Sequence, residues 1–166
     1  MNANAAFGIS VLMSFVSSAV AATLYVWPRL RMMERGRALA VLVAPHVFLR
    51  FIGLSFLVPG VVSPSLPAAF AAPAAFGDLF AGILAIAAAF ALARHRSWAL
   101  AAVWLFNTWG TADFIFAFYQ GPAVQLNPGE LGAAFFIVTA IVPPLLVTHF
   151  LIFRLLIQSA PSREAV

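Results

Sequence analysis

Five apolar runs, each near the roughly 20 residues that a helix needs to cross a bilayer, limit what this chain can fold into. They cover about residues 5–27, 38–59, 74–93, 98–119 and 131–153. Hydrophobic residues make up 64% of the chain and charged residues 8%, whereas a soluble domain carries about 25% charged residues. We therefore expect an all-α integral membrane protein, a five-helix bundle forming a single domain over residues 1–166.

The first run must be weighed against a cleaved signal peptide. Its small residues from Ser17 to Ala22 resemble a cleavage region, but the run lacks a basic start and is followed by arginines. Tyr25 and Trp27 at its end form the aromatic pair expected at a headgroup boundary. We expect a retained helix.

The arginines predict the orientation of the bundle. Basic loops stay on the cytoplasmic side of a membrane. Five spans with the N-terminus outside and the C-terminus inside place eight of the nine arginines on the cytoplasmic face, namely Arg29, Arg31, Arg35, Arg37, Arg94, Arg96, Arg154 and Arg163. The outer loops then contain only Glu130 as a charged residue. We expect a multi-pass protein of a bacterial-type inner membrane.

The residue types that the chain lacks exclude several kinds of chemistry. The chain has no Cys, which excludes disulfides, thiolate metal sites and Cys nucleophiles. It has no Lys, which excludes retinal and pyridoxal Schiff bases. The net charge of +4 suggests nucleic acid in a soluble protein, but topology explains the arginines here. We expect no nucleic-acid partner.

Three charged residues, Arg50, Asp78 and Asp113, lie inside the expected spans. Such residues are costly in a bilayer and normally face a bundle interior or water, with a partner. At about 1.5 Å per residue, Arg50 lies roughly 17 Å and Asp113 roughly 22 Å from the inner boundary, and counting Asp78 down from the outer end of its helix puts it at roughly 21 Å on the same scale. These levels allow Arg50 to reach one or both carboxylates.

One positive and two negative charges do not cancel. Either one Asp is protonated, or the surplus charge is met by a bound cation, a proton or a ligand. A purely structural alternative pairs Arg50 with one Asp and leaves the other in the outer interface. Both alternatives remain open from the sequence.

His46 and His149 are the histidines within the spans. Pro45 directly precedes His46, and His149 follows Pro143 and Pro144 in its helix. His46 lies one turn before Arg50 on the same helix face. Two histidines on different helices suggest axial haem ligation. Their expected depths, about 11 Å for His46 and about 6 Å for His149, argue against a shared iron and a metal site.

The fourth run is the most polar. Asn107 and Thr111 share a helix face, and Trp109 lies one turn before Asp113, where it could wall a site. One interpretation is that helices two, three and four enclose a polar pocket that opens to the outer side beneath a proline-rich loop. The other is that Asn107 and Thr111 make ordinary interhelical hydrogen bonds.

The third run is expected to be the centre of the bundle. Small residues recur at four-residue spacing, which lets helices approach closely, at Ala71 and Ala75 and at Gly77, Ala81 and Ala85. Before this run, four prolines make a continuous helix implausible, and they are Pro59, Pro64, Pro67 and Pro73.

The segment RFIGLSFLVPG from Arg50, followed by GDLFAGILAIAAAFAL from Gly77, resembles the start of the DoxX-like membrane proteins. That family shows an Arg with spaced Gly, Phe and Gly on its first helix and a Gly with an acidic residue at its second. The match covers under a fifth of the chain, its spacing differs by a residue, and the first helix here is extra. The resemblance implies a four-helix bundle and a redox-associated membrane subunit.

Our leading hypothesis is a non-enzymatic membrane protein that acts in transport or assists a larger complex. Its site would bind a proton, cation or small polar ligand through Arg50, Asp78 and Asp113, with His46, Asn107, Trp109 and Thr111. The alternative is a redox or lipid-modifying component that binds quinone, haem or isoprenoid through His46 and His149. A structural accessory subunit is a third possibility. The expected partners are the bilayer and either a larger membrane complex or further copies of this chain.

Overall fold

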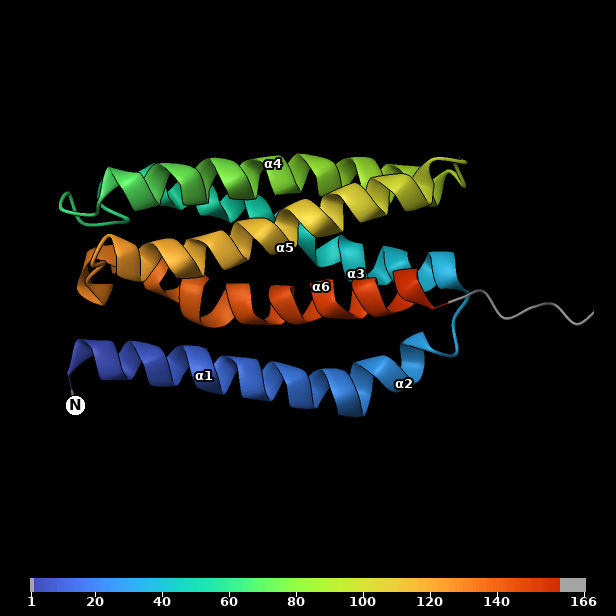
Figure 1. The fold of residues 1–166 in the computed structure, drawn as a ribbon, viewed down its shortest axis with the longest axis horizontal. Helices are drawn as coiled ribbons and strands as arrows, with labels where there is room; N and C mark the ends of the chain where they lie inside the picture. Colours follow the sequence, from blue (N-terminus) through green and yellow to red (C-terminus); the bar gives the residue numbers. More distant parts are fainter. Residues whose placement is uncertain (1, 159–166) are drawn as a thin grey trace, which may run out of the picture.

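The computed structural model describes residues 2–158, and it consists of helices joined by short loops (Figure 1). Arg163 lies outside the described residues. This part of the chain forms six α-helices, two π segments and two 3-10 segments, and no strand occurs in it. The expected first helix is one rod of α1 (Ala3–Ala21), the π segment η1 (Ala22–Val26) and α2 (Trp27–Leu30).

The other expected helices also have counterparts, although their ends differ. Helix two comprises α3 (Arg35–Leu49) and the 3-10 segment η2 (Arg50–Leu57). Helices three and four are α4 (Ala68–Ala93) and α5 (Ala99–Ala123). The last comprises the 3-10 segment η3 (Pro128–Ala134), the π segment η4 (Ile137–Ile141) and α6 (Val142–Ile157).

Four of these rods are long and apolar enough to cross a membrane, which confirms the membrane character of the chain. They are Ala3–Leu30, Arg35–Leu57, Ala68–Ala93 and Ile137–Ile157. The helix α5 is comparable in length, at 25 residues, but carries Asn107 and Asp113.

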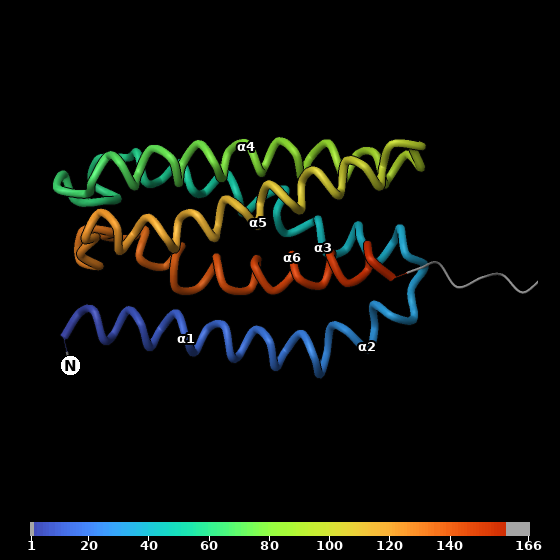
Figure 2. Tube along the Cα trace, viewed as in Figure 1, coloured from blue at the N-terminus to red at the C-terminus, as the bar shows by residue number. Residues whose placement is uncertain are grey.

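The second rod bends within its length. In Figure 2 the rod passes behind α5, from the side of α6 at one end to the side of α4 at the other. Pro45 lies inside α3, and the backbone changes to 3-10 geometry at Arg50. Proline removes a helical hydrogen bond and kinks a helix. The change from α to 3-10 geometry adds to the bend. Arg50 therefore lies at the bend.

The third helix begins earlier than expected, at Ala68 rather than at about Ala74 after Pro73. Helix α4 begins at Ala68, directly after Pro67, and continues through Pro73. Proline at this position leaves the carbonyl of Ala69 without its helical donor. The side-chain amide of Gln120 on α5 donates to that carbonyl. A neighbouring helix thus supplies the missing hydrogen bond, which permits proline in membrane helices.

The small residues of α4 are buried, but the helix is not the centre of the bundle. Ala75, Ala81 and Ala85 are fully buried, and α4 packs mainly against α3, η2 and α5. Its opposite side exposes large apolar residues, including Phe76, Phe80, Ile83, Ile86 and Phe90. Figure 1 accordingly shows α4 along one side of the molecule. Close packing on a single face is therefore what the small residues provide.

Helix α1 lies on the opposite side of the molecule (Figure 1). It contacts α6 and η4 and buries none of its residues. Phe7 packs edge-on against Phe135, and Phe15 packs against Phe118. The remaining rods form the core, and α1 covers one flank of it.

Enlarging a buried alanine of α4 should destabilise the protein. In Ala85→Leu the added methyl groups have no space, and overpacking of this kind costs about 1–3 kcal/mol. The thermal midpoint of the purified protein in detergent should fall. Ala101→Leu, at an exposed position of α5, should leave the midpoint unchanged. Equal midpoints for the two variants would contradict the packing described here.

Candidate functional site

A layer of polar side chains interrupts the core halfway along the rods. On one side of it, a hydrophobic cluster includes Leu42, Ala85, Phe106 and Ile152. On the other side, a second cluster includes Phe56, Ala75, Phe114 and Leu146. Each of the four core rods passes from one cluster to the other through buried polar residues, which are His46, Arg50, Asp78, Asn107 and His149.

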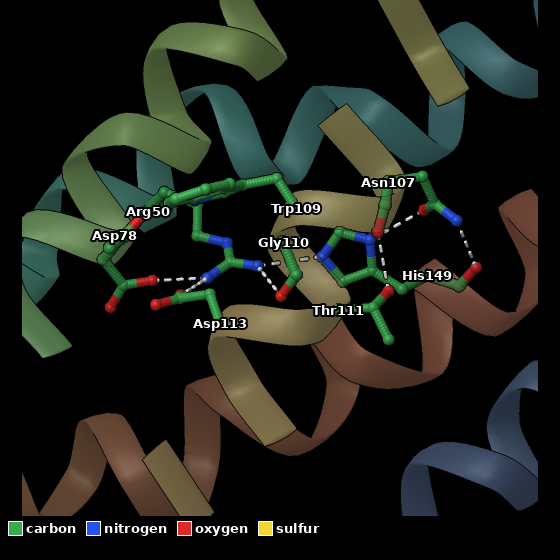
Figure 3. A network of polar contacts seen from close by, with 9 residues as sticks. Arg50, Asp78, Asn107, Trp109, Gly110, Thr111, Asp113 and His149 are labelled. Atoms are coloured by element: carbon green, nitrogen blue, oxygen red, sulfur yellow. Dashed lines mark hydrogen bonds and ion pairs between the residues drawn. The ribbon is translucent and has the colours of Figure 1, made fainter. Parts of the chain in front are cut away.

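Arg50 is the centre of this layer, and both predicted carboxylates bind it (Figure 3). Its Nη1 donates to Asp78 Oδ1 at 2.6 Å and to Asp113 Oδ2 at 2.8 Å. The arginine side chain is fully buried, while those of Asp78 and Asp113 are 9% and 8% exposed. The alternative in which Arg50 pairs with one Asp and the other lies in the outer interface does not describe this arrangement, because both carboxylates bind the same nitrogen.

The other side of the guanidinium contacts α5 and α6. Nη2 donates to the carbonyl oxygen of Gly110 at 2.7 Å and lies 2.9 Å from His149 Nε2. The guanidinium carbon lies 3.5 Å from the ring centroid of Phe114. Arginine stacks favourably on aromatic faces, particularly away from water. One side chain thus joins η2, α4, α5 and α6.

The hydrogen bonds define the form of His149. Arginine carries only donors, so Nε2 of His149 must accept from Arg50 and carries no proton. Nδ1 then donates to Asn107 Oδ1 at 2.7 Å, and Asn107 Nδ2 donates to the carbonyl oxygen of His149 at 3.2 Å. These contacts are seen on the right of Figure 3. A neutral imidazole fixed in this way orients the guanidinium.

His46 continues the layer on the far side of His149. Its ring centroid lies 4.4 Å from that of His149. The hydroxyl of Thr148 donates to the carbonyl oxygen of Leu145 at 2.7 Å, so it accepts from His46 Nε2 at 2.8 Å. Nδ1 of His46 is buried without a hydrogen-bond partner among residues 2–158.

The contact between the histidines contradicts the depth argument, which placed them at different levels. The observed helix ends do not remove the difference, because α6 extends to Ile157 and α3 begins earlier, at Arg35, so both histidines lie deeper by residue count. The count assumed straight helices, whereas the rod that holds His46 bends at Pro45 and Arg50.

The histidine pair does not fit haem ligation. Axial imidazoles stand on opposite faces of a porphyrin, whereas these rings touch each other and are tilted by 50°. Both nitrogens of His149 are engaged in hydrogen bonds as well. No group of three or more residues able to hold a metal ion occurs in the part of the chain that the structure describes.

Two of the predicted site residues lie at the margin of the cluster. Trp109 is 43% exposed, packs against Phe80, and points its Nε1 toward the carbonyl oxygen of Gly77 at 3.4 Å. The hydroxyl of Thr111 donates to the carbonyl oxygen of Asn107 within α5, at 2.7 Å. Neither side chain is hydrogen-bonded to Arg50 or to a carboxylate. Asn107 acts through His149 rather than directly.

Glycines provide the space that the cluster occupies. A Cβ atom on Gly110 would lie 2.6 Å from Arg50 Nη2 and 2.7 Å from His149 Nε2. A Cβ atom on Gly77 would collide with Asp113 Oδ1. The charged groups therefore pack directly against helix backbone, where larger residues would separate them.

A cavity of about 310 Å³ begins at the two carboxylates and extends toward the end of the molecule that holds the N-terminus. Its walls are mainly apolar and include five phenylalanines, Phe7, Phe56, Phe70, Phe114 and Phe118. Asp78 and Asp113 are the only charged residues that line it among residues 2–158. The cavity thus has one acidic end and an aromatic body.

Helices α1 and α6 also line this cavity, so helices two, three and four do not enclose it alone. The proline-rich loop packs on η3, because Ser63 N donates to the carbonyl oxygen of Glu130 at 2.9 Å and Ala133 N to that of Val61 at 2.8 Å. These contacts join the loops at one end of the bundle.

The sequence reasoning missed Phe114 and the contact of His149 with Arg50. The sequence could have indicated Phe114, since Asn107, Gly110 and Phe114 are spaced by three and four residues and therefore lie on one face of α5. Thr148, which fixes His46, adjoins His149 and had no such signal.

Alanine in place of Gly110 should disturb the cluster. The added Cβ overlaps two side chains that other bonds hold in place, so Gly110→Ala should lower stability by about 1–3 kcal/mol. Thermal unfolding in detergent measures the change. Gly8→Ala, where a Cβ meets nothing within 4 Å, should be neutral or slightly stabilising. Equal stability of Gly110→Ala and the unchanged protein would contradict the close approach.

One comparison with known proteins finds a match, and it is to a family model. No curated protein and no solved structure matches the chain. The resemblance to DoxX-like proteins therefore stays a prediction. The family model of a domain of unknown function, DUF8737, matches residues 6–157. The match includes every residue of the polar layer and nearly all the helical part of the chain, so the protein belongs to the DUF8737 family.

Proposed function

We propose that the protein spans a bacterial-type inner membrane five times, with its N-terminus outside. The distribution of basic residues supports this topology, because the loops after α2 and α4 and the end of α6 lie at one end of the molecule (Figure 1). At that end Arg35 donates to the carbonyl oxygen of Leu156, and Arg154 lies over Trp27. The cavity then opens in the outer half of the membrane.

Within this topology, we propose that the Arg50, Asp78 and Asp113 cluster binds a proton or a cation, as in a transporter-like protein or an accessory subunit. One observation carries the proposal: two carboxylates share one guanidinium and face a cavity. Asp78 Oδ2 and Asp113 Oδ1 have no hydrogen-bond donor among the described residues. The surplus negative charge requires a proton or another cation, since unpaired charge is costly away from water.

Arg50 holds the carboxylates in place, while His149 and Asn107 hold Arg50. His149 is neutral and accepts a hydrogen bond from the guanidinium. The positive charge of Arg50 is therefore balanced by the two carboxylates alone. The other charged or titratable side chains of the layer are His46 on α3 and His149 on α6, and α1 contributes none. The proposal is one of binding, with Asp78 and Asp113 as the groups that meet the ligand.

The charge balance predicts the titration of the cluster. With one carboxylate removed, the remaining carboxylate and Arg50 cancel, so neither Asp78→Asn nor Asp113→Asn needs a bound proton. We expect infrared spectroscopy to detect a buried protonated carboxyl group that titrates in the unchanged protein and is missing from both variants. Glu130→Gln, in an outer loop where Gln can keep the capping interaction, should retain the signal. A signal that persists in both Asp variants would refute the proposal.

Removal of Arg50 should be more damaging than removal of all three charges. Arg50→Gln leaves two carboxylates without their cation, and breaking a buried ion pair costs about 3–5 kcal/mol. The triple variant Arg50→Gln, Asp78→Asn, Asp113→Asn removes the charges together and should regain much of the loss. Thermal midpoints in detergent compare the variants. A triple variant less stable than Arg50→Gln would show that mutual charge compensation is not what stabilises the cluster.

A further inference from the structure

We propose that the cavity binds an amphipathic organic cation, with its ammonium group at Asp78 and Asp113 and its apolar body among the phenylalanines. The inference rests on the proposed binding function of the cluster and names the class of ligand. It begins from the position of the charges. The carboxylates line the cavity, whereas the guanidinium of Arg50 does not. A ligand in the cavity therefore meets acceptors at this end.

The geometry of the carboxylates suits an ammonium group. Asp78 Oδ1 and Asp113 Oδ2 are bonded to the same nitrogen of Arg50, which keeps the two groups side by side. Their second oxygens have no donor among residues 2–158, although both side chains are more than nine-tenths buried. An ammonium group supplies donors and the positive charge that the cluster lacks. A carboxylate or phosphate ligand would be repelled.

The remaining walls suit an apolar and preferably aromatic body. Phe56 and Phe70 pack edge-to-face at 5.6 Å on one side of the cavity, and Phe118 belongs to the side formed by α5. Aromatic faces also attract cations within about 6 Å, which favours an ammonium group near the base. An inorganic cation would leave most of this space without contacts.

The volume limits the size of the ligand. A cavity of about 150 Å³ holds benzene in other proteins, and this one is about 310 Å³. The volume therefore fits an aromatic ring with a short aliphatic chain, or two small rings. Phenylbutylammonium has this size, and phenylbutanol and phenylpentanoate carry the same body with a neutral and an anionic head.

Binding of these three probes to the purified protein in lipid nanodiscs tests the inference by calorimetry. We expect phenylbutylammonium to bind about tenfold or more tightly than phenylbutanol, because the alcohol can donate a single hydrogen bond to a carboxylate and lacks the positive charge and further donors of the ammonium group. Phenylpentanoate should not bind. Asp78→Asn and Asp113→Asn should each weaken the binding of the ammonium probe and reduce its preference over the alcohol. Equal affinity for ammonium and alcohol would overturn the inference, since the cavity would then select only an apolar body.

A variant that fills the cavity separates this inference from the proposed function. Ala117→Phe, one turn after Asp113, should occupy the space and abolish binding of the probe while the carboxyl titration remains. Ala101→Phe, exposed on the same helix, should bind normally. Failure of the ammonium probe to bind the unchanged protein refutes the inference alone if the titration is present. If the titration is missing too, proton binding, which is the part of the proposed function that this experiment tests, fails with it.

Discussion

The structure depends on a single guanidinium that lies away from water and must satisfy its charge within the bundle. Arg50 does so by binding Asp78, Asp113, Gly110 and His149, which come from α4, α5 and α6. Lipid gives helices little incentive to associate, so interhelical hydrogen bonds and close packing have to hold them together. The cluster supplies the hydrogen bonds at the level where all four core rods meet, and the small residues of α4 and α5 supply the packing.

The same cluster separates two parts of the molecule with different surroundings. Toward the arginine-rich end the core is closely packed alanine and aliphatic residues, with Ala85, Ala88, Ala91 and Val103 fully buried. Toward the opposite end the core is looser and aromatic, and it contains the cavity. The polar layer is therefore the base of the cavity and the top of a solid core. A ligand that reached Asp78 and Asp113 would come from the loop end or from the flank that α1 covers.

Much of this arrangement follows from the sequence, and the failures have physical reasons. Arg50, Asp78 and Asp113 could be placed together because charge inside an apolar run needs a partner and depth follows from residue counts. His149 was misplaced relative to His46 because the depth count assumed straight helices, whereas the rod that holds His46 bends at Pro45 and Arg50. The third helix was expected to begin only after Pro73, because Gln120, which donates to the carbonyl of Ala69 and so compensates for this proline, lies on another helix and is invisible to local reasoning. A polar pocket on helices two, three and four was predicted, but its aromatic walls and the share of α1 and α6 were not, since they depend on how five rods pack.

The 3-10 geometry of η2 makes the second rod longer than an α-helix of the same number of residues. A 3-10 helix rises about 2.0 Å per residue and an α-helix about 1.5 Å. The eight residues Arg50–Leu57 are therefore about 4 Å longer than they would be as α-helix. Runs of this length in 3-10 form are uncommon, and here the extra length lets the segment reach from the guanidinium to the loop end with fewer residues than an α-helix would need.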